Sequence, residues 1–189
     1  MKDPENYEAR AEIMWCGSLS HNGLTGCGIC GGDWATHLIE HELGGMFDVA
    51  HGAGLAAVWG SWARYVMDEK PERFAQFAVD VMGVEESDDV KSTALKGIEA
   101  VEEFYRMIEM PTNMKELGIN PTDEQIKDMA MKATNHDTQQ LGAFKKFGLS
   151  IIDSEEGTSS KLSKVMKMHK NYDYILTSSS NTRRYFKDA

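Results

Sequence analysis

Residues 36–52 read THLIEHELGGMFDVAHG, a stretch that places three histidines within fifteen residues. His37 and His41 are four residues apart, so on a helix both imidazoles project from one face, about one turn from each other. His51 follows the pair Gly44-Gly45, where we expect the chain to bend and reverse direction. The three imidazoles can therefore converge, and imidazole is a ligand that suits zinc or ferrous iron.

Apolar residues recur at helical spacing on both sides of this stretch, and no sustained period-two pattern occurs before residue 148. We expect a buried first helix with Asp3 as its N-cap, and a second helix capped by Asp33. The predicted helices cover residues 7–19, 33–43, 53–67, 71–82 and 88–110, with a further one starting at 120–124. The sequence therefore predicts an all-α, multi-helix bundle of roughly seven helices without an internal repeat.

Composition and charge narrow the range of partners. The chain has 189 residues, of which 41% are hydrophobic and 26% charged, which is typical of one globular domain. Its net charge of -10 repels phosphate backbones and anionic lipids, so we expect neither nucleic acid nor a membrane as a partner.

The first residues lack the apolar core of a secretory signal, and the three cysteines are an odd number. Both features predict a cytoplasmic protein with reduced thiols.

The character of the chain changes after Gly148, so we divide it into a helical metal-binding domain, residues 1–148, and a divergent C-terminal tail, residues 149–189. Residues 154–163 are polar and rich in serine, and residues 172–177 are prone to form a strand. The segment is either a loosely attached tail or a final helix and strand that pack on the domain.

Other motifs have simpler explanations. Residues 26–31 match G-x-G-x-x-G, but they follow a predicted helix, whereas a dinucleotide-binding turn follows a strand. Cys27 and Cys30 form a C-x-x-C pair without a second such pair, so we interpret them as unrelated thiols. His136 and His169 have no partners at ligand spacing and are expected to be solvated.

Two interpretations compete for the central histidines. Residues 37–41 match the H-x-x-E-H pattern of inverted zinc peptidases, in which His37 and His41 would bind the metal and Glu40 would activate a water molecule. The second interpretation uses a longer stretch. Residues 37–56 have the spacing H-x3-H-x-L-G-G-x5-H-G-x-G-L-A, and Trp62-Ala63-Arg64-Tyr65 follows.

This longer pattern resembles the iron-containing (group III) alcohol dehydrogenases, in particular the butanol dehydrogenase branch. The resemblance extends to residues 3–34, which include Asn22-Gly23-Leu24, and to residues 111–147, which include Leu117-Gly118-Ile119. It implies that the fold is the C-terminal helical, metal-binding domain of that family, which is dehydroquinate synthase-like. The N-terminal nucleotide-binding domain would be absent from this chain.

The resemblance also implies roles for individual residues. His37 and His51 match the two histidines of the family's helical domain that bind Fe2+ or Zn2+. His41 matches a histidine of the substrate pocket or proton relay, and Glu40 becomes an ordinary helix residue. The family's two other ligands, an aspartate and a histidine four residues later, correspond to nothing after Met1.

The implied function is the interconversion of short-chain primary alcohols, such as butanol, and their aldehydes. In the complete enzyme, which we expect to be a homo-oligomer, the metal would polarise the substrate oxygen and NAD(P)H would exchange a hydride with the same carbon. Without the nucleotide-binding half we expect this chain to be inactive on its own. A domain kept only for binding or oligomerisation is the alternative.

Overall fold

All regular structure in the computed structural model is helical. It describes residues 3–28 and 31–148, and the chain divides into two compact units after Asp33. The helices are α1 (Tyr7–His21), α2 (Ala35–Phe47), α3 (His51–Val66), α4 (Pro71–Asp80), α5 (Val90–Met107) and α6 (Asp123–Ala133), with 3-10 turns η1 (Leu24–Gly26) and η2 (Met67–Glu69). The described residues contain no strand, only an isolated bridge between Leu141 and Phe147. The all-α prediction is confirmed.

The first unit differs from the prediction in the residue that caps its helix. Asn6, not Asp3, caps α1, because its side-chain oxygen accepts a hydrogen bond from the backbone N–H of Ala9. Asp3 instead accepts one from the N–H of Glu5. No residue of α1 is buried, and Trp15 is 63% exposed. The apolar spacing therefore predicted the helix correctly, and the burial of its face stays a prediction.

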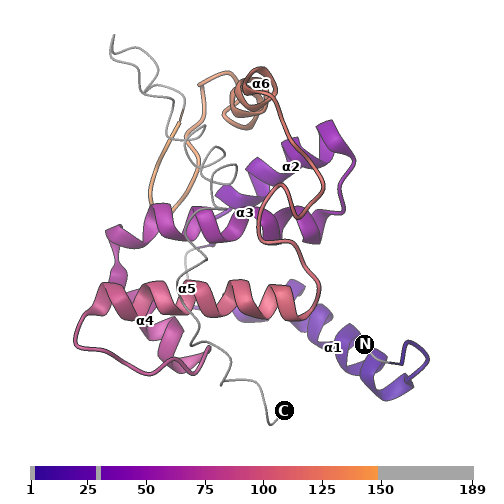
Figure 1. Ribbon diagram of the computed structural model, residues 1–189, viewed down its shortest axis with the longest axis vertical. Helices are drawn as coiled ribbons and strands as arrows, with labels where there is room; N and C mark the ends of the chain where they lie inside the picture. Colours follow the sequence, from indigo (N-terminus) through magenta and orange to yellow (C-terminus); the bar gives the residue numbers. More distant parts are fainter. Residues whose placement is uncertain (1–2, 29–30, 149–189) are drawn as a thin grey trace. The chain divides into compact units, whose positions relative to one another are not determined.

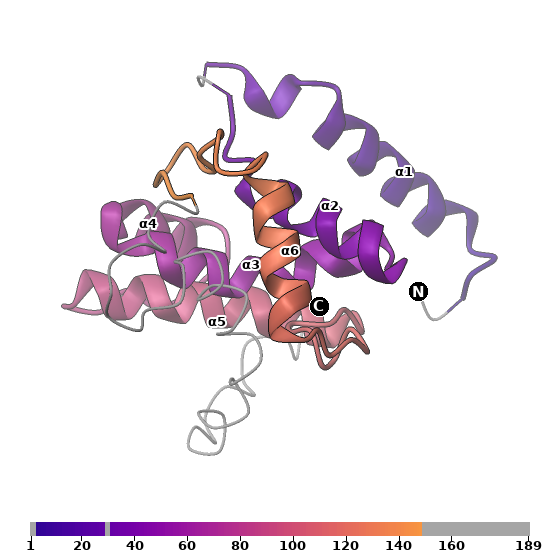
Figure 2. The ribbon, with the colours of Figure 1, turned by 90° about the horizontal axis from the view of Figure 1, so that it is seen from above.

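The second unit has a core on either side of α3, the central helix. On one side α2 packs against α3, and α6 packs against α2 (Figure 2). The buried residues there are Ala35, Ile39, Leu43, Val58, Met114, Ile126, Met129, Ala130, Ala133, Leu141 and Phe147. Thr122 begins α6 with a reciprocal capping box with Gln125, as the Asn120–Glu124 signal predicts.

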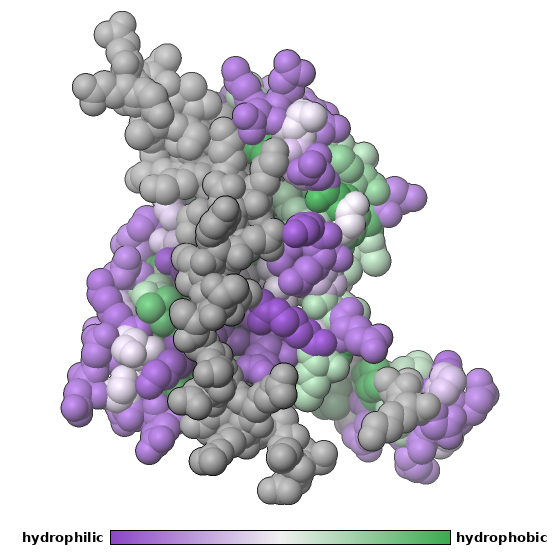
Figure 3. Space-filling view, in the orientation of Figure 1, coloured by the Kyte–Doolittle hydropathy of each residue, from purple (hydrophilic) through white to green (hydrophobic). Residues whose placement is uncertain are grey.

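On the other side of α3, helices α4 and α5 run side by side (Figure 1). They approach closely because Gly97 of α5 lies against Ala78 of α4, where a Cβ atom on Gly97 would be 2.4 Å from that of Ala78. The outer surface over these two helices is mainly hydrophilic (Figure 3), as their amphipathic pattern predicts. No helix of the described chain is long and apolar enough to cross a bilayer.

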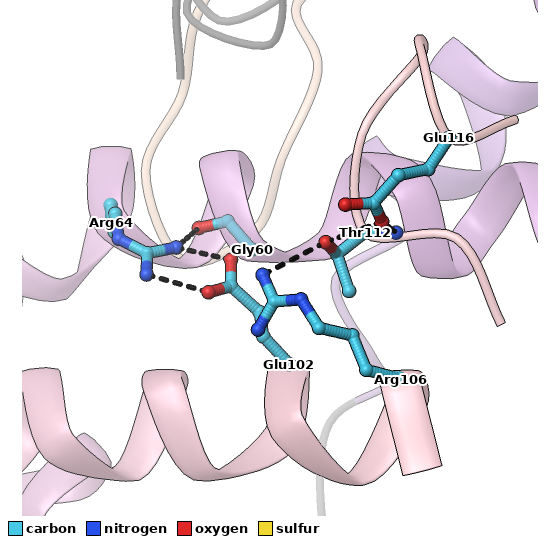
Figure 4. Close-up of polar contacts among 6 residues, drawn as sticks. All are labelled: Gly60, Arg64, Glu102, Arg106, Thr112 and Glu116. Carbon is cyan, nitrogen blue, oxygen red and sulfur yellow. Dashed lines mark hydrogen bonds and ion pairs between the residues drawn. The ribbon is translucent and has the colours of Figure 1, made fainter. Parts of the chain in front are cut away.

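Polar contacts join α3 to α5, and α5 to the loop that follows it (Figure 4). Arg64 of α3 forms two hydrogen bonds with the carboxylate of Glu102 on α5, both side chains being nearly buried. Further along, Arg106 donates to the hydroxyl of Thr112, and Thr112 donates to the carboxylate of Glu116. Burial would raise the pKa of Glu116, but the hydrogen bonds with Thr112 and Asn113 and the charge of Arg106 together outweigh it and lower that pKa.

Several interpretations from the sequence concern other parts of the chain. The G-x-G-x-x-G segment follows the helix α1 and the turn η1, so the strand that a dinucleotide-binding turn requires is not there. Cys27 is exposed and free, and His136 is exposed, as expected. Cys30, His169 and the tail at 149–189 lie outside the described residues.

Candidate metal centre

The three central histidines are placed by the turn between α2 and α3. Helix α2 is not broken at Gly44-Gly45 but continues through both glycines to Phe47, so the expectation that the chain reverses there is wrong. The chain reverses after Asp48, which adopts left-handed angles (φ 53°, ψ 41°) while its N–H bonds to the carbonyl of Gly44. Aspartate tolerates this conformation better than most residues, which allows the helix to end there. Helix α3 then starts at His51 itself.

This arrangement brings the three imidazole rings together. His37 and His41 project from successive turns of α2, with ring centroids 6.4 Å apart. The His51 ring lies 5.4 Å from that of His37 and 5.5 Å from that of His41. Two imidazoles bound to one tetrahedral ion, with metal–nitrogen distances of about 2.1 Å, have ring centroids about 5 Å apart. Both pairs that include His51 therefore have a separation that fits a shared divalent ion.

The site is partly open to solvent. His41 is exposed, His37 is partly buried, and the side chain of His51 is 53% exposed. The ring of Trp34 contacts His37 edge-on, with centroids 4.8 Å apart, and restricts its orientation. Within residues 3–28 and 31–148, one group of three possible ligands has its donor atoms within 4.8 Å of one another: Glu40, His41 and His51. A small ligand can thus reach a cluster of nitrogen and oxygen donors here.

Glu40 is not the ordinary helix residue that the resemblance predicts. Its side chain is 1% exposed, and its carboxylate oxygen Oε2 is hydrogen-bonded to Nδ1 of His51. When the carboxylate is ionised it only accepts hydrogen bonds, and the imidazole N–H is then the donor. That expectation fails because α2 packs on α3 and Glu40 turns inward. Gly54 has no side chain and leaves space for it there.

The same geometry bears on the peptidase interpretation. In that mechanism Glu40 would take a proton from a water molecule held between His37 and His41. Here the carboxylate is buried and hydrogen-bonded to a third histidine, which the H-x-x-E-H pattern does not include. A carboxylate hydrogen-bonded to an imidazole in this way is an arrangement that also occurs beside metal-binding histidines.

Comparison with known sequences assigns the helical region to one family. The profile described as the Fe-containing alcohol dehydrogenase family, C-terminal, matches residues 1–152. The "Probable NADH-dependent butanol dehydrogenase 1" of Bacillus subtilis is 38% identical over 157 residues, which cover 80% of this chain and 39% of that protein. The "NADPH-dependent aldehyde reductase YqhD" of Escherichia coli is 34% identical over 143 residues, covering 75% of this chain and 36% of the relative.

A solved structure shows the same fold. The crystal structure of an NADH-dependent butanol dehydrogenase A from Thermotoga maritima superposes with a TM-score of 0.73 at 30% sequence identity. The match covers 89% of this chain but 40% of that one. This chain therefore corresponds to the helical part of these dehydrogenases and spans about two fifths of their length.

Proposed function

This chain belongs to the iron-containing alcohol dehydrogenase family, and from that premise we propose that it is the metal-binding part of an NAD(P)-dependent enzyme acting on short-chain primary alcohols and aldehydes. The observation that carries the proposal is the convergence of three imidazoles, from α2 and the start of α3, in which both pairs that include His51 have a separation that suits a shared divalent ion. The names of the relatives, butanol dehydrogenases and an aldehyde reductase, support the substrate class.

Each histidine has a separate role in this proposal. His37 and His51 contribute one ring nitrogen each to an Fe2+ or Zn2+ ion, and the exposed His41 faces the substrate and exchanges a proton with its oxygen. When bound, the ion supplies Lewis-acid polarisation of the substrate oxygen. The partly open site admits a small alcohol, while Trp34 shields one side of His37.

Metal binding by single-histidine variants tests the assignment. We expect His37→Ala and His51→Ala each to weaken Zn2+ binding by at least about tenfold. Even the loss of a residue that only hydrogen-bonds to a metal ligand weakens metal affinity by about that factor. His41→Ala should retain nearly the affinity of the wild type, because His41 is assigned to the substrate. Isothermal titration calorimetry of the 189-residue chain, together with the metal content after dialysis, measures both effects.

Other patterns of loss would contradict this assignment. A loss in His41→Ala that equals the loss in His51→Ala would make His41 the ligand. If Glu40→Gln abolished a hydrolytic activity of the chain, the zinc peptidase interpretation would replace the dehydrogenase. Unchanged metal content in all three histidine variants would favour a helical domain kept for binding or oligomerisation.

We also expect the 189-residue chain by itself not to reduce aldehydes. It spans 39% of the length of the Bacillus subtilis relative, and the proposal places the nicotinamide-binding domain and two further metal ligands in the remainder. Absorbance at 340 nm, recorded with butyraldehyde and either NADH or NADPH, measures this. Turnover by the purified chain, at a rate that depends on His51, would refute the expectation.

A further inference from the structure

Glu40 is an unusual residue for the interface between α2 and α3. A carboxylate loses its hydration when it is buried, so a 1% exposed side chain at this position opposes folding unless a partner compensates it. Its neighbours on the inner face of α2, Ile39 and Leu43, are apolar and fully buried. An apolar residue would fill the position at lower cost. The structure therefore places a charge where packing alone does not require one.

The partner of this charge is a histidine of the candidate metal centre. Oε2 of Glu40 is hydrogen-bonded to Nδ1 of His51, which leaves Nε2 as the ring nitrogen that remains for a metal ion. The side chain of His51 is 53% exposed.

The backbone of α3 is shaped to accept the carboxylate. A Cβ atom on Gly54 would lie 2.7 Å from both Cγ and Oε1 of Glu40, so a side chain there would displace Glu40. Gly54 is itself buried, one turn after His51 on the same helix. The pocket for Glu40 and the imidazole that it contacts therefore belong to one rigid element.

From these contacts we infer that Glu40 is a positioning residue that holds His51 in the Nδ1-protonated tautomer and presents Nε2 to the metal ion. The inference rests on the proposed function for the role of the ion, but the tautomer itself is a property of the chain without metal. A carboxylate in this position also increases the basicity of the imidazole toward a cation. Gly54 contributes by leaving space for the carboxylate.

The first test measures the tautomer directly. Long-range 15N–1H NMR distinguishes an imidazole protonated at Nδ1 from one protonated at Nε2. The metal-free chain is measured at about pH 8.5, well above the pKa of about 6.5 of a free imidazole. We expect the Nδ1-protonated form of His51 to predominate in the wild type and to lose that predominance in Glu40→Ala. Glu40→Gln should retain part of it, because an amide oxygen can still accept the hydrogen bond. An unchanged tautomer in both variants would overturn the inference.

The second test measures Zn2+ affinity. We expect Glu40→Ala and Gly54→Ala each to weaken Zn2+ binding by about 10–100-fold, with a smaller loss in Glu40→Gln. Gly45→Ala is the matched control, because a Cβ atom on this helical glycine of α2 meets nothing within 4 Å. If Glu40→Ala does not fold, Glu40→Gln and Gly54→Ala decide the question. Affinities equal to that of the wild type in those two variants would overturn the inference.

The two proposals fail in different ways. If the wild-type chain bound no Zn2+, the metal-binding role would fail, while the NMR measurement without metal would still decide whether Glu40 sets the tautomer of His51. If His51→Ala weakened Zn2+ binding and the Glu40 and Gly54 variants did not, His51 would remain a ligand and the positioning role of Glu40 would be wrong.

Discussion

Replacing Arg64 by alanine should lower the free energy of unfolding by about 3–5 kcal/mol, the range measured when one partner of a buried ion pair is removed. The Arg64 and Glu102 side chains are 13% and 9% exposed, and they form two parallel hydrogen bonds between α3 and α5 (Figure 4). Without the guanidinium, the Glu102 carboxylate remains buried and unneutralised. Urea or guanidinium chloride unfolding, followed by circular dichroism, measures the loss.

An exposed ion pair of the same chain provides the control. Lys91 of α5 pairs with Asp68 of η2, and both side chains are more than half exposed. The hydrogen bond and charge of Lys91 lower the pKa of Asp68, but solvent screens such a pair. We expect Lys91→Ala to lower the stability far less than Arg64→Ala. Equal losses would show that the Arg64–Glu102 pair contributes no more than a surface contact.

The ion pair between Arg64 and Glu102 could not be predicted from the sequence, because its two residues belong to different helices. Arg64 and Glu102 are separated by 38 residues, and the ion pair depends on how α5 crosses α3. A Cβ atom on Gly60 would lie 2.0 Å from Oε1 of Glu102, so this glycine provides the space for the carboxylate. Spacing along one helix reveals neighbours three or four residues apart, and it contains no information on a contact across two helices.

Helix positions were the most predictable feature because their signals are local. The proline at the start of α4, the Asp89 cap of α5 and the capping box of Thr122 all lie within one turn of the helix ends that they define. The errors arise where a local signal competes with something more distant. Gly44 and Gly45 stay helical, and the turn forms at Asp48 instead.

The sequence predicted the histidine cluster of the candidate site but not the contact between Glu40 and His51. The spacing of His37, His41 and His51 predicted that their rings converge, and the structure places them together. The partner of His51 was missed because Glu40 reaches it from the preceding helix, eleven residues away. Gly54 was a usable signal: a glycine inside an otherwise apolar helix indicates close approach of another group.

Metal binding should stabilise the fold itself, because the proposed ligands His37 and His51 belong to different helices, α2 and α3. At about 100 times its dissociation constant, Zn2+ is expected to raise the free energy of unfolding by about 2.7 kcal/mol, provided that the unfolded chain does not hold the ion. Denaturant unfolding with Zn2+ and then with EDTA measures the gain and its removal. His51→Ala should reduce the gain to about 1.4 kcal/mol or less, because a loss of affinity of about tenfold or more leaves Zn2+ at no more than about 10 times its dissociation constant. His136→Ala should retain it, because His136 is exposed and outside the cluster of possible ligands. Equal free energies of unfolding with Zn2+ and with EDTA would show that no ion links α2 and α3. An equal loss of the Zn2+-dependent gain in His51→Ala and His136→Ala would show the same, because an ion bound by both helices makes that gain depend on His51.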